Sequence, residues 1–138
     1  MKRFFLIIFL FQSLFALSQE LGSIEKGKHT LKLFKHNHFY SISFSNEKTN
    51  SLTSESEFSF PKKETILQLI KDGFKKKNNH LLIVQTNQDT IVKFEFRKFK
   101  GNWFLKIKQN NLIGQSISSS SFFKKEKVLE LFKSNSNS

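Results

Sequence analysis

Residues 92–108 read VKFEFRKFKGNWFLKIK, and this stretch indicates the kind of fold that the chain adopts. Apolar and charged residues alternate on both sides of Lys100-Gly101, which predicts two strands that each bury one side and expose the other. If Lys100-Gly101 forms the two-residue turn of a β-hairpin, Phe96 lies opposite Leu105 on the buried face. That single pairing then sets the partner of every other residue in the hairpin.

A similar pattern occurs 63 residues earlier in the chain. Leu33 and Ile42 occupy the positions of the facing pair, and Asn37-His38 occupies the position of the turn. Matching patches that recur in one order at nearly one offset are typical of an internal duplication. We therefore expect a second hairpin with Leu33 opposite Ile42.

Two matching helical segments follow the hairpins. Residues 62–71 read KKETILQLIK and residues 124–133 read KKEKVLELFK, and their apolar residues recur at helical spacing. The alignment of the two segments places Leu67 and Leu129 at equivalent positions, which we expect to lie in the core.

These patterns predict an α+β fold. Its internally duplicated β-hairpin–strand–helix units are expected to form one antiparallel sheet with two helices packed on one face. Serine-rich residues 53–60 and 113–120 are the candidate third strands, and the apolar segment 80–86 is predicted to be a central strand.

The N-terminus predicts export. Lys2 and Arg3 precede an apolar run that begins at Phe4, and Ala16-Leu17-Ser18 supplies small residues where a signal peptidase cleaves. The run is shorter than the ~20 apolar residues of a membrane-spanning helix. We expect a secreted or periplasmic protein that is cleaved near Ser18/Gln19 and has no transmembrane segment in its mature chain.

The expected organisation follows from this boundary. Residues 1–18 are the signal peptide, and residues 19–133 form a single α+β domain whose repeat halves span about 28–74 and 90–133. Residues 134–138 (SNSNS) are predicted to be a disordered polar tail.

No catalytic or metal-binding pattern emerges from the sequence. The chain has no cysteine, and a metal site would have to gather His29 or His80 beside His36 and His38. The Ser59 and Ser121 S-x-x-K motifs lack the companion motifs of serine penicillin-binding enzymes. We expect a protein that is not an enzyme and that uses no cofactor or metal.

Charge is the strongest functional signal. The chain has 23 basic and 11 acidic residues, a net charge of +12, and loss of Lys2 and Arg3 would leave +10. Lysine and arginine on the solvent-facing side of the second hairpin would attract anions, and Phe104 is the best candidate there for stacking on a base. The candidate anion-binding residues are Lys93, Arg97, Lys106 and Lys108.

Two functions fit these observations. The favoured prediction is a small, non-enzymatic, exported binding or accessory protein, whose partner is an anionic envelope component or another protein. The alternative is an exported basic protein that binds anions or nucleic acid through a lysine- and arginine-rich sheet face. Excess lysine could instead serve solubility and protect sheet edges. The sequence does not name the ligand or the oligomeric state.

Overall fold

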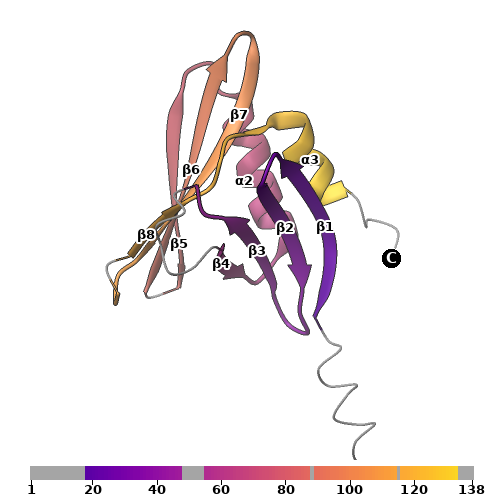
Figure 1. Ribbon diagram of the computed structural model, residues 1–138, viewed down its shortest axis with the longest axis vertical. Helices are drawn as coiled ribbons and strands as arrows, with labels where there is room; N and C mark the ends of the chain where they lie inside the picture. The colour runs from indigo at the N-terminus through magenta and orange to yellow at the C-terminus, as the bar shows by residue number, and fades with distance from the viewer. Residues whose placement is uncertain (1–17, 48–54, 88, 115, 134–138) are drawn as a thin grey trace, which may run out of the picture.

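The computed structural model describes residues 18–47, 55–87, 89–114 and 116–133. Within them the chain forms two antiparallel sheets and two helices, so the α+β class is confirmed. Figure 1 shows the two sheets as separate walls, with the helices side by side where the sheets meet.

Sheet A contains the N-terminal strands in the order β1-β2-β3-β4. Its strands are β1 (Gln19–Lys26), β2 (His29–Lys35), β3 (Tyr40–Ser45) and β4 (Glu55–Phe60). Sheet B has the order β5-β6-β7-β8, and the short strand β9 also pairs with β7. Its strands are β5 (His80–Asn87), β6 (Thr90–Phe99), β7 (Asn102–Asn111), β8 (Ser116–Ser119) and β9 (Phe123–Lys124).

The prediction of one sheet with both helices on one face is wrong. Helix α2 (Lys63–Lys75) contacts β6 of sheet B, whereas α3 (Lys125–Lys133) contacts β1 and β2 of sheet A as well as β7. Each sheet has one apolar side, and two short helices could not cover the apolar side of a single sheet this wide. Because the two sheets face the same helices, the apolar side of each sheet is buried in one hydrophobic cluster.

The core requires a glycine in α2. Gly73 lies against the ring of Phe96, and a Cβ atom built on Gly73 would stand 2.1 Å from the Phe96 Cζ. Phe74, the next residue, packs edge-on against the same ring at 5.1 Å between centroids. This close approach holds α2 against sheet B.

The predicted hairpin registers are confirmed. Phe96 pairs with Leu105 in the β6–β7 hairpin, and Leu33 pairs with Ile42 in the β2–β3 hairpin. Lys100 and Gly101 both have positive φ, at 51° and 81°, as a tight two-residue hairpin turn requires. The register determines which side chains of β6 and β7 face solvent.

Three finer predictions need correction. Leu67 and Leu129 are only half-buried. The buried residues are Ile66, Ile70, Gly73 and Phe74 in α2 and Val128, Leu131 and Phe132 in α3. The apolar segment 80–86 was expected to be central, but β5 is an edge strand of sheet B.

Strand β1 was not predicted at all. A bulge between Glu20 and Gly22 separates its buried residues, Leu21 and Ile24, by three positions instead of two. The alternation that identifies a strand is therefore interrupted where it would have been informative.

The predicted signal peptide, apart from Ser18, and the predicted polar tail at residues 134–138 lie outside the described residues. Across the described part of the chain, neither helix has the length and hydrophobicity needed to cross a membrane.

Candidate functional site

The candidate anion-binding residues share the side of sheet B that points away from the core. Strands alternate their side chains, so every second residue of β6 and β7 reaches this side. The register places Lys93 opposite Lys108 and Arg97 opposite Phe104. We call this surface the basic face of sheet B: Lys93, Glu95, Arg97, Phe104, Lys106 and Lys108.

A carboxylate lies among these cations. Glu95 Oε1 is 2.9 Å from an Arg97 guanidinium nitrogen, and Glu95 Oε2 is 3.6 Å from Lys108 Nζ. The Glu95 side chain is only 13% exposed, so water screens these contacts less than it would on an open surface. Glu95 thus holds two cations at fixed positions on the face.

The other two predicted cations differ in their surroundings. Lys106 Nζ forms an ion pair with Glu47, which lies two residues after the end of β3 in sheet A. Lys93 has no ion pair with any residue of the described part. The structure therefore brings all four predicted residues to one face, and three of the four have a carboxylate partner.

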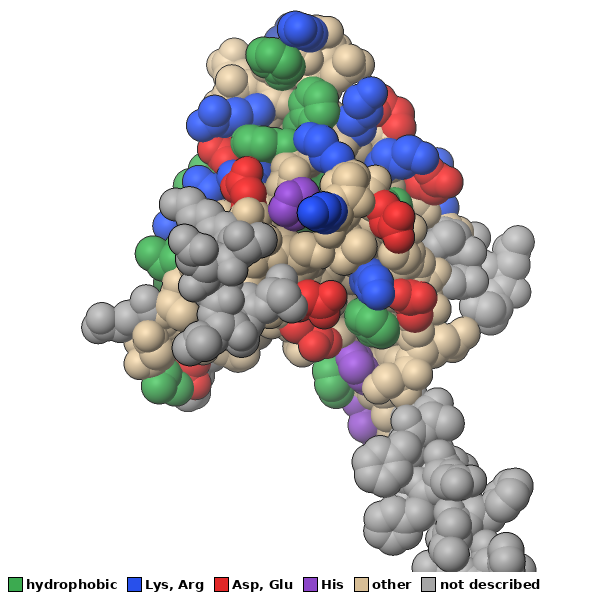
Figure 2. All heavy atoms as spheres, viewed as in Figure 1, with side chains coloured by type: hydrophobic (Ala, Val, Ile, Leu, Met, Phe, Trp, Pro, Cys, Tyr) green, Lys and Arg blue, Asp and Glu red, His purple; other side chains and the backbone are tan. Residues whose placement is uncertain are grey.

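An aromatic pocket adjoins the basic face. It has a volume of about 410 Å³ and is open to solvent, and two cations and three phenylalanines line it. The lining residues are Lys26, Arg97, Phe99, Phe104 and Phe122. Figure 2 shows basic and apolar side chains intermixed over the upper part of the molecule, where Figure 1 places the β6–β7 hairpin.

The cations of this pocket sit over aromatic rings. Lys26 Nζ lies 5.8 Å from the centre of the Phe104 ring. Arg97 and Lys106 lie 5.9 and 5.1 Å from the centre of the Phe122 ring. Such contacts hold a positive charge beside the ring. The pocket therefore combines stacking surfaces with charges that can meet an anion.

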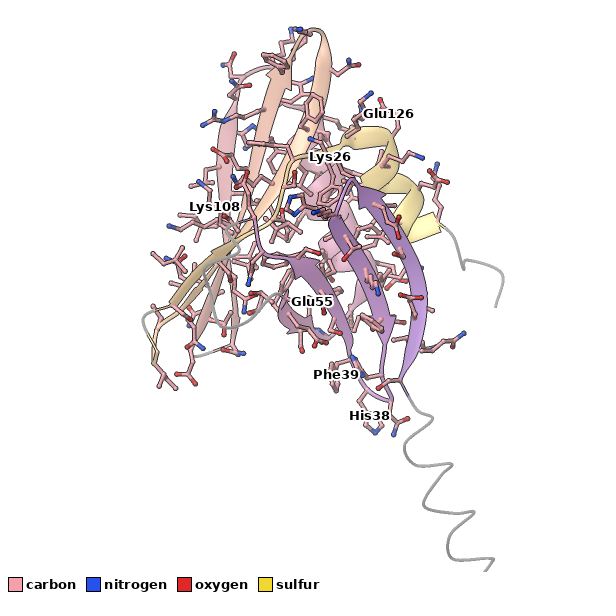
Figure 3. The ribbon with its side chains drawn as sticks, in the orientation of Figure 1. Lys26, His38, Phe39, Glu55, Lys108 and Glu126 are labelled. Carbon is pink, nitrogen blue, oxygen red and sulfur yellow. The ribbon has the colours of Figure 1, made fainter. Side chains whose placement is uncertain are left out.

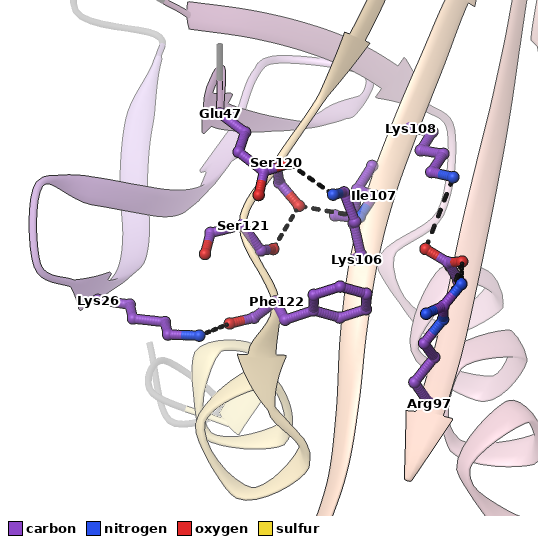
Figure 4. A network of polar contacts seen from close by, with 10 residues as sticks. Lys26, Glu47, Arg97, Lys106, Ile107, Lys108, Ser120, Ser121 and Phe122 are labelled. Atoms are coloured by element: carbon purple, nitrogen blue, oxygen red, sulfur yellow. Dashed lines mark hydrogen bonds and ion pairs between the residues drawn. The ribbon is translucent and has the colours of Figure 1, made fainter. Parts of the chain in front are cut away.

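Phe122 belongs to the segment between β8 and β9, and hydrogen bonds hold this segment in place (Figure 4). Ser120 is fully buried; its amide donates to the Ile107 carbonyl, and its hydroxyl accepts from the Ile107 amide at 2.9 Å. Lys26 Nζ donates a hydrogen bond to the Phe122 carbonyl oxygen at 2.9 Å. These bonds fix the chain on both sides of the Phe122 side chain.

Two further pockets continue the site. One of about 280 Å³ shares Arg97 with the aromatic pocket and includes Glu95 and Lys108. Another of about 270 Å³ shares Lys26 and Phe104 with it. Figure 3 shows Lys26 at the end of sheet A nearest this region and Lys108 farther along sheet B. The three pockets are therefore adjacent, and both sheets contribute residues to their lining.

Sequence reasoning found the cations and Phe104 but missed three residues of the pocket. Lys26 ends β1, and its position against sheet B depends on tertiary packing. Phe99 ends β6. Phe122 precedes the buried Phe123, and two adjacent phenylalanines in an extended segment point to opposite sides. The adjacent pair Phe122-Phe123 was the sequence feature that could have identified Phe122 as a solvent-facing aromatic residue.

The histidines do not gather at a site. His36 lies beside the β2–β3 turn, where it stacks on Phe39 at 4.4 Å and makes a 2.8 Å hydrogen bond with the Ser41 hydroxyl. His80 stacks on Phe96 in sheet B. No group of three metal-ligating side chains occurs among the described residues.

Comparison with known proteins gives one match. No protein-family model matches the chain, and neither does any curated protein. Among solved structures, the chain is similar to the crystal structure of WHY1 from Arabidopsis thaliana, with 12% sequence identity and a TM-score of 0.47. The match covers 83% of this chain and 86% of that chain.

The favoured functional prediction, an exported accessory protein, is corrected at this point. The two cations and three phenylalanines around one open pocket fit the alternative, a basic protein that binds nucleic acid, better than they fit an accessory protein. A likeness at this TM-score does not itself argue for a function. The case for the alternative is therefore made below from the basic face and its pockets alone.

Proposed function

We propose that the protein binds single-stranded nucleic acid across the basic face of sheet B and the adjoining aromatic pocket. The main support is one open pocket that is lined by three phenylalanines and two cations: Phe99, Phe104, Phe122, Lys26 and Arg97. Aromatic rings offer stacking surfaces to bases, and the cations neutralise the phosphates that connect them.

The aromatic pocket favours an unpaired strand over a duplex. Stacking on a side chain needs a base whose face is free, and in a duplex both faces of an internal base are covered by its neighbours. Phe99 is 63% exposed, so its ring is available to such a base. The cations alone would attract either form of nucleic acid.

The corresponding face of sheet A supports assigning the site to sheet B. At the spacing of 63 residues, Phe104 and Lys106 correspond to Ser41 and Ser43. These serines are buried or nearly so, and a serine can neither stack on a base nor neutralise a phosphate. At these two positions β3 therefore lacks the aromatic and basic groups that β7 carries.

We also propose that the two sheets with their following helices descend from a duplicated unit. The matching hairpin registers support this, as do the paired buried positions Ile66 with Val128 and Ile70 with Phe132. On this proposal one copy kept or acquired the basic face and the other did not.

Export remains a proposal as well. It is supported by the start of β1 at Gln19, directly after the predicted cleavage site. The intact mass of secreted protein should correspond to a chain that begins at Gln19, give or take about two residues. A secreted chain that retained Met1 would contradict the proposed cleavage.

Binding is tested with a labelled twelve-residue oligothymidine and a duplex of the same length, followed by fluorescence anisotropy. We expect the single strand to bind more tightly and its affinity to fall steeply between about 50 and 200 mM salt. An oligouridine arm distinguishes DNA from RNA. Equal affinity for duplex and single strand would contradict the role of the aromatic pocket, and no binding would overturn the proposal.

A further inference from the structure

The pocket that contains Glu95 differs in chemistry from the aromatic pocket beside it. Asn79, His80, Glu95, Arg97 and Lys108 supply its polar side chains. Its volume of about 280 Å³ lies below the ~300–1,000 Å³ of sites for drug-sized ligands, and it suits a group the size of one base. Because it shares Arg97 with the aromatic pocket, a strand stacked there would place a neighbouring base in it.

Glu95 sets what this pocket can accept. A carboxylate only accepts hydrogen bonds, so the edge of the base that meets it must donate. Oε1 already accepts from Arg97 Nε at 3.1 Å, whereas the nearest ion-pair partner of Oε2 is Lys108 Nζ at 3.6 Å, beyond hydrogen-bond length. Oε2 therefore keeps its capacity to accept.

The neighbouring cations supply the opposite chemistry. The Arg97 guanidinium has five N–H donors in a planar fork, and its contacts with Glu95 leave others free. The pocket therefore places an acceptor, the 13% exposed Glu95 carboxylate, beside a donor, the Arg97 guanidinium, with Lys108 next to them. A complementary ligand presents donors next to an acceptor along one edge.

Adenine and cytosine each have one amino donor beside a ring-nitrogen acceptor, whereas guanine alone has two neighbouring donor groups beside an acceptor. Its N1–H and N2–H₂ groups donate side by side, and O6 accepts next to them. Adenine and cytosine would each turn a ring-nitrogen lone pair toward the carboxylate, and thymine and uracil offer a single N–H between two carbonyl oxygens. Resting on the proposed function, we propose that the Glu95 pocket is a guanine-selective subsite, with Glu95 Oε2 accepting from the adjacent N1–H and N2–H₂ groups and Arg97 donating to O6.

The first test uses the unaltered protein and a twelve-residue oligothymidine with one central substitution. Placing guanine there should tighten binding about tenfold relative to adenine, the effect of one good bidentate contact. Hypoxanthine lacks the N2 amino group and should lose most of this gain. Equal affinity for guanine, adenine and hypoxanthine, with oligothymidine still bound, would overturn the subsite and leave the proposed function standing.

A variant locates the effect. Glu95→Gln should abolish the preference for guanine over adenine, measured as the ratio of the two affinities in the variant, because its absolute affinity for oligothymidine will change with the loss of the ion pairs to Arg97 and Lys108. The matched control, Glu57→Gln, removes a carboxylate from sheet A and should retain the preference. If Glu95→Gln binds oligothymidine and still prefers guanine, Glu95 does not read the base. If none of the oligonucleotides binds the unaltered protein, the proposed function itself fails.

Discussion

Lys26 and Phe122 lie 96 residues apart in the sequence, yet the Lys26 ammonium donates a hydrogen bond to the Phe122 carbonyl oxygen at 2.9 Å. This bond joins the first hairpin of sheet A to the β8–β9 segment of sheet B. Lys26 also lies over Phe104, on the opposite wall of the aromatic pocket. The pocket is therefore complete only when both sheets are packed together.

Lys26→Ala should weaken single-strand binding by more than the loss of one surface charge, because it removes both a cation and a support of Phe122. Lys28→Ala is the matched control, since Lys28 is an exposed lysine in the turn that directly follows Lys26. Both variants should keep a thermal unfolding midpoint close to that of the parent. Equal losses of affinity in the two variants would mean that only net charge matters.

Glu47 should oppose binding, because its carboxylate pairs with Lys106 on the basic face. Glu47→Gln should raise affinity for oligothymidine and make log K fall more steeply with log salt, by roughly 0.7 for one further phosphate contact. Glu55→Gln serves as the control, since Glu55 lies on β4 of sheet A. An unchanged salt slope would show that Lys106 does not meet a phosphate.

Gly73→Ala should destabilise the protein although alanine favours helices. The added methyl group would overlap the Phe96 ring, and overpacking costs about 1–3 kcal/mol, against a helix-propensity gain of about 1 kcal/mol. We expect a net loss of up to about 2 kcal/mol by chemical denaturation. Adding Phe96→Leu should relieve part of the overlap, and a stability gain in the single variant would contradict this packing.

Much of the local structure could be predicted from the sequence because it depends on local patterns. The β6–β7 register follows from strict alternation around a two-residue turn, and one pairing, Phe96 with Leu105, sets the rest. The four basic candidates could be assigned to one face for the same reason. In β1 the bulge at Glu20 and Gly22 interrupts the alternation, and the strand was missed.

The remaining features depend on tertiary packing. No local pattern shows that the strands divide into two sheets, or that α3 covers sheet A while α2 contacts sheet B. The same holds for Lys26, which reaches the pocket from the other sheet. The apolar run at the start of β5 indicated a buried strand, yet Ile83 is 60% exposed at the edge of sheet B.

Stacking on Phe104 distinguishes nucleic-acid binding from general attraction of polyanions. The deciding measurement compares Phe104→Ala with Phe39→Ala, an exposed phenylalanine at the turn end of sheet A, on oligothymidine and on inorganic polyphosphate. Circular dichroism confirms that both variants fold.

We expect Phe104→Ala to weaken oligothymidine binding by about 1–3 kcal/mol, the usual contribution of one stacked base. Its affinity for polyphosphate, which has no bases, should not change, and Phe39→Ala should leave both affinities unaltered. If Phe104→Ala binds oligothymidine as tightly as the parent, or loses oligothymidine and polyphosphate to the same extent, the protein does not bind single strands by stacking on this face.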